Sequence, residues 1–188
     1  MIKKILTIAV ALLVGGYSAQ AEKERDVLIL EIAGENSGTV KIELFNDIAP
    51  LHVERIKELT QTGAYNNIAF HRVIDGFMAQ TGDVQYGDVS GDNLDRAGMG
   101  GSDLPDLKAE FSALPFRRGT VGMARSQNPD SGNSQFFIMF EDGSFLNGQY
   151  TVFGRVISGQ EVVDSIKLGD GQNGSVTNPD YIKTATIE

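Results

Sequence analysis

Short runs of β-branched and aromatic residues alternate with polar turns along most of this chain. The first two runs, 27–32 (VLILEI) and 40–45 (VKIELF), flank the turn-forming segment 34–38 (GENSG) and predict an opening hairpin. Similar runs predict further strands at 68–74, 77–81, 120–124, 134–140, 151–157 and 181–187. Because few helical segments separate these strands, we expect an antiparallel sheet.

Two segments show helical spacing instead. The first, 50–62, starts with a proline after the cap candidates Asn46 and Asp47, and its apolar residues recur at Val53, Ile56 and Leu59. The second spans 160–168. Together the elements predict a mainly β fold: a closed antiparallel eight-stranded barrel capped by two α-helices, in one domain over 22–188.

The N-terminus has the pattern of a secretory signal peptide. Lys3 and Lys4 precede the apolar run 5–14, and Ala19-Gln20-Ala21 matches a cleavage site. The apolar run is about half the length that a helix needs to span a bilayer. We therefore expect residues 1–21 to be removed and the chain to reach the periplasm or be secreted, with no membrane association after cleavage. An uncleaved N-terminal anchor is the alternative.

Composition narrows the chemistry. The chain has no cysteine, which excludes a disulfide framework, a thiolate nucleophile and a zinc–thiolate site. Its formal net charge of −9 argues against a nucleic-acid-binding surface. Nothing in the sequence requires more than a monomer. Two histidines cannot build a three-histidine metal site by themselves, and His52 is most simply a surface residue on the first helix.

Several other segments resemble catalytic or binding motifs. Residues 169–174 (GDGQNG) match the dinucleotide-binding letters, but a predicted helix precedes them, so a turn is the better interpretation. A Ser-His-Asp triad and a carboxylate pair cannot be dismissed by counting residues, yet nothing in the pattern favours either. The long Gly- and Asp-rich segment 83–116 is typical of a functional loop, and 98–101 (GMGG) would allow close backbone approach.

Residues 70–83 (FHRVIDGFMAQTGD) carry the most unusual pattern. Strand alternation would place Phe70, Arg72 and Ile74 on one face and His71 and Val73 on the other. An arginine without an evident acidic partner, close to Phe, Met and Gln, points to a site. The alternative is that Arg72 has no functional role and extends its side chain to solvent at the barrel rim.

Later segments add 119–124 (GTVGMA), 134–138 (SQFFI), 145–148 (FLNG) and 152–154 (VFG), in that order. With 70–83, these motifs make the chain resemble the cyclophilins, the barrel-type peptidyl-prolyl cis-trans isomerases, over essentially all of 27–188. It is most similar to the secreted bacterial members. The resemblance implies that the protein isomerises X-Pro bonds of proline-containing polypeptides, including unfolded exported proteins, without cofactor or metal.

The resemblance also implies roles for individual residues. Arg72 matches the catalytic arginine, and Gln80 the amide beside it. The apolar pocket that receives the proline ring in the family corresponds here to Phe77, Met78, Phe137 and Leu146. The remaining substrate-binding positions are His71, Ala124, Arg125, Ser126, Gln135, Phe145 and Tyr150, with His71 lining the site without acting as an acid or base.

The chain departs from the family pattern at several of these positions. Phe145 stands where many eukaryotic members have a tryptophan that contacts cyclosporin, so we expect weak cyclosporin binding at most. Tyr150 replaces a histidine, and Arg125 replaces an asparagine whose contact is largely through its backbone. Thr81 and Ser126 replace a glycine and an alanine, which would alter the preference for residues before proline.

Two other classes of function remain open at this point. A proline-peptide-binding module or holdase would use the same pocket without turnover, although such a module would more often lose the arginine. A structural interaction domain would depend on its acidic surface instead of the pocket. The intact pair of Arg72 and Gln80 favours the enzyme.

Overall fold

The computed structural model describes residues 25–188, so the predicted signal peptide lies outside the described residues. The strands are β1 (Val27–Ala33), β2 (Gly38–Leu44), β3 (Ile68–Ala69), β4 (Arg72–Ile74), β5 (Met78–Thr81), β6 (Thr120–Met123), β7 (Phe136–Met139), β8 (Val152–Ser158) and β9 (Tyr181–Ile187). The α-helices are α1 (Pro50–Gln61) and α2 (Gln160–Ser165). The predicted mainly β fold with antiparallel strands and two helices is confirmed.

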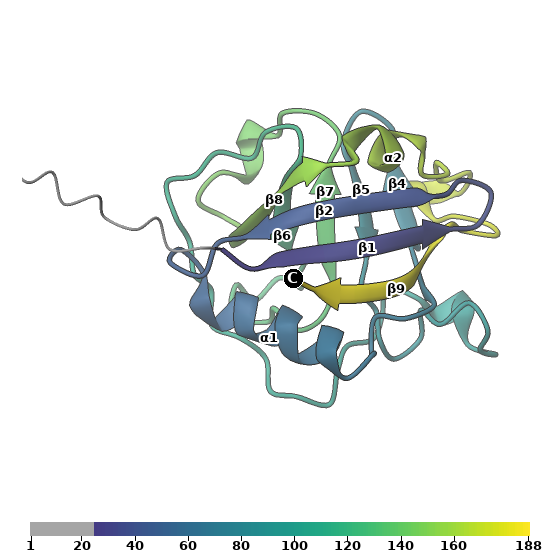
Figure 1. Ribbon diagram of the computed structural model, residues 1–188, viewed down its shortest axis with the longest axis horizontal. Coiled ribbons are helices and arrows are strands. Elements are labelled where there is room, and N and C mark those ends of the chain that lie inside the picture. Colours follow the sequence, from purple (N-terminus) through teal and green to yellow (C-terminus); the bar gives the residue numbers. More distant parts are fainter. Residues whose placement is uncertain (1–24) are drawn as a thin grey trace, which may run out of the picture.

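The strands form one curled sheet. Its order is β3-β9-β1-β2-β8-β6-β7-β5-β4, and every pairing is antiparallel. In Figure 1, β1, β2 and β9 lie in front of β4, β5 and β7, so the sheet wraps around its own core. The helix α1 lies along one open end, and α2 lies near the other.

The expected closed eight-stranded barrel is wrong in strand number and in closure. Within residues 25–188 the sheet has nine strands, and its order starts at β3 and ends at β4 without returning. The expected strand 68–74 is interrupted at Phe70 and His71, which leaves the two short strands β3 and β4. One half pairs with β9 and the other with β5, at opposite ends of the sheet.

The same interruption overturns the predicted faces of this segment. Phe70 and Val73 are both buried in the main core, although simple alternation put them on opposite faces. Arg72 and Ile74 are only partly buried, and Ile74 packs against a second apolar cluster. Arg72 therefore points out of the main core, toward the outer side of the sheet.

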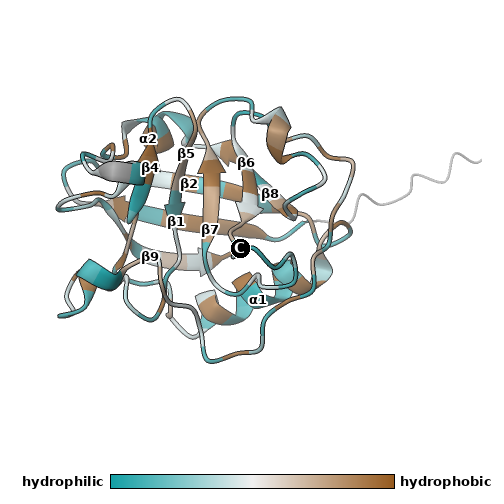
Figure 2. Cartoon of the chain, turned by 180° about the vertical axis from the view of Figure 1, so that it is seen from behind, coloured by the Kyte–Doolittle hydropathy of each residue, from teal (hydrophilic) through white to brown (hydrophobic). Residues whose placement is uncertain are grey.

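Alternation along β7 separates the two apolar clusters. Phe136 and Ile138 point into the main core inside the curled sheet, whereas Phe137 and Met139 belong to the second cluster outside it. All four side chains are buried, and Figure 2 shows β7 as a strongly hydrophobic strand. The second cluster thus gives the outer face of the sheet an apolar floor.

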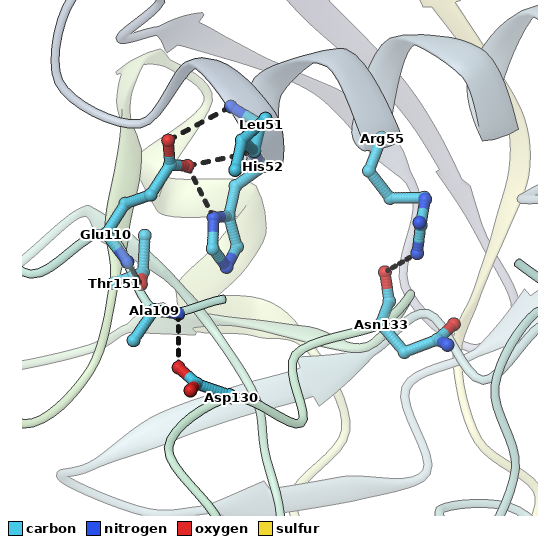
Figure 3. Close-up of polar contacts among 8 residues, drawn as sticks. All are labelled: Leu51, His52, Arg55, Ala109, Glu110, Asp130, Asn133 and Thr151. Carbon is cyan, nitrogen blue, oxygen red and sulfur yellow. Dashed lines mark hydrogen bonds and ion pairs between the residues drawn. The ribbon is translucent and has the colours of Figure 1, made fainter. Parts of the chain in front are cut away.

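The helices differ from the sequence expectation at their ends. The N-cap of α1 is Ala49, not Asn46 or Asp47, and the N–H groups of Leu51 and His52 donate to the Glu110 carboxylate at 3.2 and 3.1 Å (Figure 3). A residue far along the chain therefore caps the helix. The helix α2 ends at Ser165 instead of 168, because Ile166 turns to an extended conformation and is buried in the core.

His52 is not the surface residue that the sequence suggested. Its side chain is buried, with Nδ1 2.7 Å from the Glu110 carboxylate. Burial lowers the pKa of His52, while the hydrogen bond to Glu110 acts in the opposite direction. On the same helix, Arg55 donates to the backbone carbonyl of Asn133 at 3.2 Å (Figure 3), so α1 supports the segment that leads into β7.

No helix among the described residues is both long enough and apolar enough to cross a membrane.

Candidate active site

Arg72 is the first residue of β4, and the tight β4–β5 hairpin places it directly opposite Gln80. Its Nη1 donates to the Gln80 side-chain oxygen at 3.2 Å, and its Nε donates to the backbone carbonyl of Asn173 at 3.0 Å. Partial burial lowers the pKa of Arg72, and Tyr150 acts in the opposite direction. With a further hydrogen bond from Nη1 to the Met78 sulfur at 3.9 Å, the guanidinium has three contacts within the protein, which differs from a side chain that only reaches for solvent.

A directional chain of amides continues from the arginine. Gln80 Nε2 donates to the Gln135 side-chain oxygen at 2.9 Å, and Gln135 Nε2 donates to the carbonyls of Gly98 and Gly100 at 3.1 and 2.7 Å. A guanidinium can only donate and a carbonyl can only accept, so the orientation of both amides is fixed from the two ends. These hydrogen bonds link β4, β5, the residue that precedes β7 and the 83–116 loop.

A hollow of about 390 Å³ lies beside the guanidinium. Polar and apolar groups share its lining, which comes from Arg72, Phe77, Met78, Gln80, Ala124, Arg125, Phe137, Phe145, Leu146, Gln149 and Tyr150. The structure therefore brings together nine of the predicted site residues with the arginine, and adds Gln149, which the sequence analysis missed. The hollow is large enough for a small apolar ring and open enough for a chain to pass.

Aromatic rings make the hollow rigid. Phe137 stacks on Phe116 at 5.6 Å between ring centroids, and Tyr150 meets Phe137 edge-on at 5.8 Å. At the other side Phe77 contacts Phe145 at 5.4 Å. Phe145 is nonetheless 63% exposed, so it forms a rim and not a floor.

Arg125 does more than the backbone contact expected from the sequence. Its guanidinium lies 4.3 Å from the centre of the Tyr150 ring, and its Nη2 donates to the Gln149 carbonyl at 2.9 Å. Its Nη1 also donates to the carbonyl of Ser126 at 2.9 Å. Arg125 therefore joins two loops that form opposite parts of the wall.

A second hollow of about 410 Å³ continues from the first and shares Gln80, Ala124 and Arg125 with it. Ser126, Gln135 and the 98–102 backbone complete much of its wall. The backbone approaches closely here, as expected for 98–101, because a Cβ on Gly101 would lie 3.0 Å from the Asn133 side chain. The two hollows form a groove in which a peptide can extend to one side of the first hollow.

His71 lies apart from both hollows. It is buried beneath Gly98, where a Cβ would be 3.1 Å from the imidazole, and it is absent from the residues that line either hollow. Burial lowers the pKa of His71, while the charge of Asp83 and hydrogen bonds with the Ala69 backbone and the Gln135 side chain act in the opposite direction. Its place in the fold is under the loop, not on the wall.

Three contacts at the site could not be predicted from residue type or spacing. Gln149 and Asn173 act through backbone carbonyls, which any residue carries, and Asp83 holds the 83–116 loop from a position within the recognised motif. Asn173 has a left-handed conformation, with φ of 62°. The Asn-Gly pair at 173–174 is typical of such a turn, so the sequence indicates the turn but not its contact with Arg72. Among the described residues, no cluster of three or more His, Asp or Glu side chains could hold a metal ion.

Comparison with known proteins gives a consistent result. Residues 28–187 match the family described as cyclophilin type peptidyl-prolyl cis-trans isomerase/CLD. A probable peptidyl-prolyl cis-trans isomerase of Brucella suis is 58% identical over 182 residues, which are 95% of this chain and 91% of that protein. A peptidyl-prolyl cis-trans isomerase of Acinetobacter baylyi is 36% identical over 84% of this chain and 80% of its own.

Solved structures agree with these relatives. A cyclophilin-type isomerase of Cryptosporidium parvum, crystallised in the presence of the dipeptide Ala-Pro, has a TM-score of 0.73 at 28% identity and covers 86% of this chain and 98% of its own. The Hirschia baltica cyclophilin AquaCyp293 has a TM-score of 0.70 at 27% identity, over 85% of this chain and 73% of its own. The chain belongs to the cyclophilin-type peptidyl-prolyl cis-trans isomerase family.

Proposed function

We propose that this protein isomerises X-Pro bonds with Arg72 as its catalytic residue and the first hollow as its proline-ring pocket. The observation that carries this role is the placement of a fixed guanidinium beside a hollow that also exposes the side chains of Phe77, Met78, Phe137 and Leu146. Nε and Nη1 are engaged by the protein, whereas Nη2 has no hydrogen-bond partner in the described part of the chain. That group is available to a bound peptide.

The reaction explains why an arginine suits this place. Amide resonance gives the X-Pro bond a barrier of about 18–20 kcal/mol, and uncatalysed exchange takes tens of seconds or more. In the twisted transition state resonance is lost and the proline nitrogen regains its lone pair. A donor aimed at that nitrogen stabilises the twisted state more than either planar state, which is the requirement for catalysis. The charged, rigid guanidinium of Arg72 is such a donor.

The pocket contributes by holding one side of the bond. Phe77, Met78, Phe137 and Leu146 would grip the proline ring while the preceding carbonyl turns. Raising a rate from about 0.01 to about 1,000 per second needs roughly 7 kcal/mol off the barrier, at about 1.36 kcal/mol per tenfold. Apolar burial, a charge-assisted hydrogen bond and desolvation of the amide together reach that order.

NMR exchange spectroscopy on a short X-Pro peptide, with the 22–188 protein, tests the proposal directly. We expect cross-peaks between cis and trans resonances on a subsecond timescale, because the enzyme interconverts the two forms on its surface. Binding and turnover are reported separately in this experiment. Peptide binding with exchange at the uncatalysed rate would instead identify a binding module or holdase.

We further propose that cyclosporin binds weakly. Phe145 offers the rim a ring without a donor, whereas a tryptophan adds both area and an N–H group. The Phe145→Trp variant should bind cyclosporin about 10-fold more tightly than the native protein in isothermal titration calorimetry, equivalent to about 1.4 kcal/mol. Phe111→Trp is the control, because Phe111 is also exposed and does not line the pocket. Equal affinity of the native protein and Phe145→Trp would contradict the role given to Phe145.

We also propose that the clients are exported proteins, reached after cleavage at Ala21. The support is the sequence pattern of residues 1–21. Intact mass spectrometry of the protein purified from the extracytoplasmic fraction of a bacterial host should give a chain that starts at Glu22. A chain starting at Met1 and retained with the membrane would establish the uncleaved anchor instead.

A further inference from the structure

The Gly-rich turn at 169–176 docks against β4, at the open edge of the sheet. Gly169 N donates to the Val73 carbonyl at 2.9 Å, and Val176 N donates to the His71 carbonyl at 3.2 Å. Between these contacts, Ser175 forms an isolated antiparallel bridge with Arg72. The turn therefore pairs with the backbone of Arg72 as a short strand would. Its sequence matches a dinucleotide-binding motif, but the structure shows the predicted turn.

The turn also reaches the arginine's side chain. The Asn173 carbonyl accepts the 3.0 Å hydrogen bond from Arg72 Nε. Asn173 has φ of 62° and ψ of 16°, and Gly174 follows with φ of 79°. Two successive left-handed residues rotate the carbonyl toward Arg72, which an ordinary extended or helical turn would not do.

Close packing keeps this turn in one conformation. A Cβ on Gly174 would collide with the Ile74 side chain, and a Cβ on Gly169 would collide with the backbone of Gly174. The turn is closed by further backbone bonds from Asp170 N and Gly171 N to the Ser175 carbonyl, both of 3.1 Å. The carbonyl of Asn173 is therefore presented by a built structure.

We propose that the 169–176 turn is a positioning element for Arg72, acting through the Asn173 carbonyl. Gln80 holds Nη1 and Asn173 holds Nε, so two separate points define the plane of the guanidinium. Its Nη2 group then faces the substrate side. This inference rests on the proposed catalytic role of Arg72, because a fixed plane matters only if the guanidinium must meet a twisted amide.

The test compares two asparagines that both have a positive φ. Asn178, with φ of 51°, lies in the same connection to β9 but is not a partner of Arg72. Valine resists the left-handed conformation, so Asn173→Val and Asn178→Val should lose similar stability. We expect kcat to fall about 10-fold in Asn173→Val, with KM within about twofold, and both to stay within about twofold of native in Asn178→Val.

Asn173→Gly serves as the rescue. Glycine adopts the left-handed conformation freely and keeps the carbonyl in place, so kcat should stay within about twofold of the native value. A kcat for Asn173→Val equal to that of Asn178→Val would overturn the proposal. So would a loss of kcat in Asn173→Gly as large as in Asn173→Val, since the side chain and not the carbonyl would then be responsible.

A measurement on the native protein keeps the test valid if Asn173→Val does not fold. NMR can detect scalar coupling across the hydrogen bond from Arg72 Nε to the Asn173 carbonyl carbon, with Arg72→Lys used to assign the resonance. We expect the coupling, together with slow exchange of the Nε proton. Absence of both in the native protein would refute the positioning role whatever the variants do. Full turnover in Arg72→Ala would instead refute the catalytic role, so the two failures are distinguishable.

Discussion

Replacing Arg72 with alanine should lower kcat/KM for an X-Pro peptide by about 10³-fold, equivalent to about 4 kcal/mol of transition-state stabilisation. The guanidinium contributes through a charge-assisted hydrogen bond that forms fully only when the amide is twisted, so most of the loss should appear in kcat. The apolar pocket is not altered, and peptide binding should therefore persist. NMR exchange on the native protein and the variant side by side measures both quantities.

Two further variants sharpen this prediction. Arg72→Lys keeps the positive charge but cannot contact Gln80 and Asn173 together as the planar group does, so it should remain well below native activity. His71→Asn should be far less damaging than Arg72→Ala, because the imidazole is buried beneath Gly98 and does not line the hollow. Equal losses in His71→Asn and Arg72→Ala would show that the roles have been assigned wrongly.

The parts of the site that could be predicted from the sequence are those set by local geometry. Arg72 and Gln80 are eight residues apart, and a tight hairpin between them places both on one face. The family motif places Phe137 in the pocket, and period-two alternation then puts its neighbour Phe136 on the opposite, core-facing side, as the structure shows. These relations need no knowledge of the distant chain.

What could not be predicted depends on contacts between remote segments. The interruption at Phe70 and His71 separates β3, which pairs with β9, from β4, which pairs with β5, and hydropathy alone cannot distinguish this from one continuous strand. The capping of α1 by Glu110 joins residues 58 or more positions apart, so local cap signals pointed elsewhere. Burial of His52 follows from that same long-range contact.

The second large effect should come from Asp83, which organises the 83–116 loop. Its carboxylate is fully buried and each oxygen accepts two backbone N–H groups: Oδ1 from Gln85 and Tyr86 at 3.0 and 2.9 Å, and Oδ2 from Gly98 and Gly100 at 2.7 and 2.9 Å. Asp83→Asn keeps the shape but replaces one acceptor with a donor. Two N–H groups then lose their partner and face another donor.

We expect Asp83→Asn to reduce the free energy of unfolding by about 3 kcal/mol, since unsatisfied buried donors cost about 1–3 kcal/mol each. Urea unfolding with an unchanged m-value would measure it. Asp88→Asn in the same loop makes the same charge change where the carboxylate bonds only with exposed Ser90, and should stay within about 0.5 kcal/mol of native. Equal stability of the two variants would contradict the organising role of Asp83.

Asp83→Asn should also lower the activity, because Asp83 positions the loop carbonyls that accept hydrogen bonds from Gln135. Gly98 and Gly100 donate to Asp83 through their N–H groups and accept from Gln135 Nε2 through their carbonyls. Loosening the loop therefore frees one end of the amide chain that fixes Gln80 against Arg72. Under conditions where Asp83→Asn is folded, kcat should fall several-fold while Asp88→Asn keeps its native value, so the loop contributes to catalysis through the orientation of two amides.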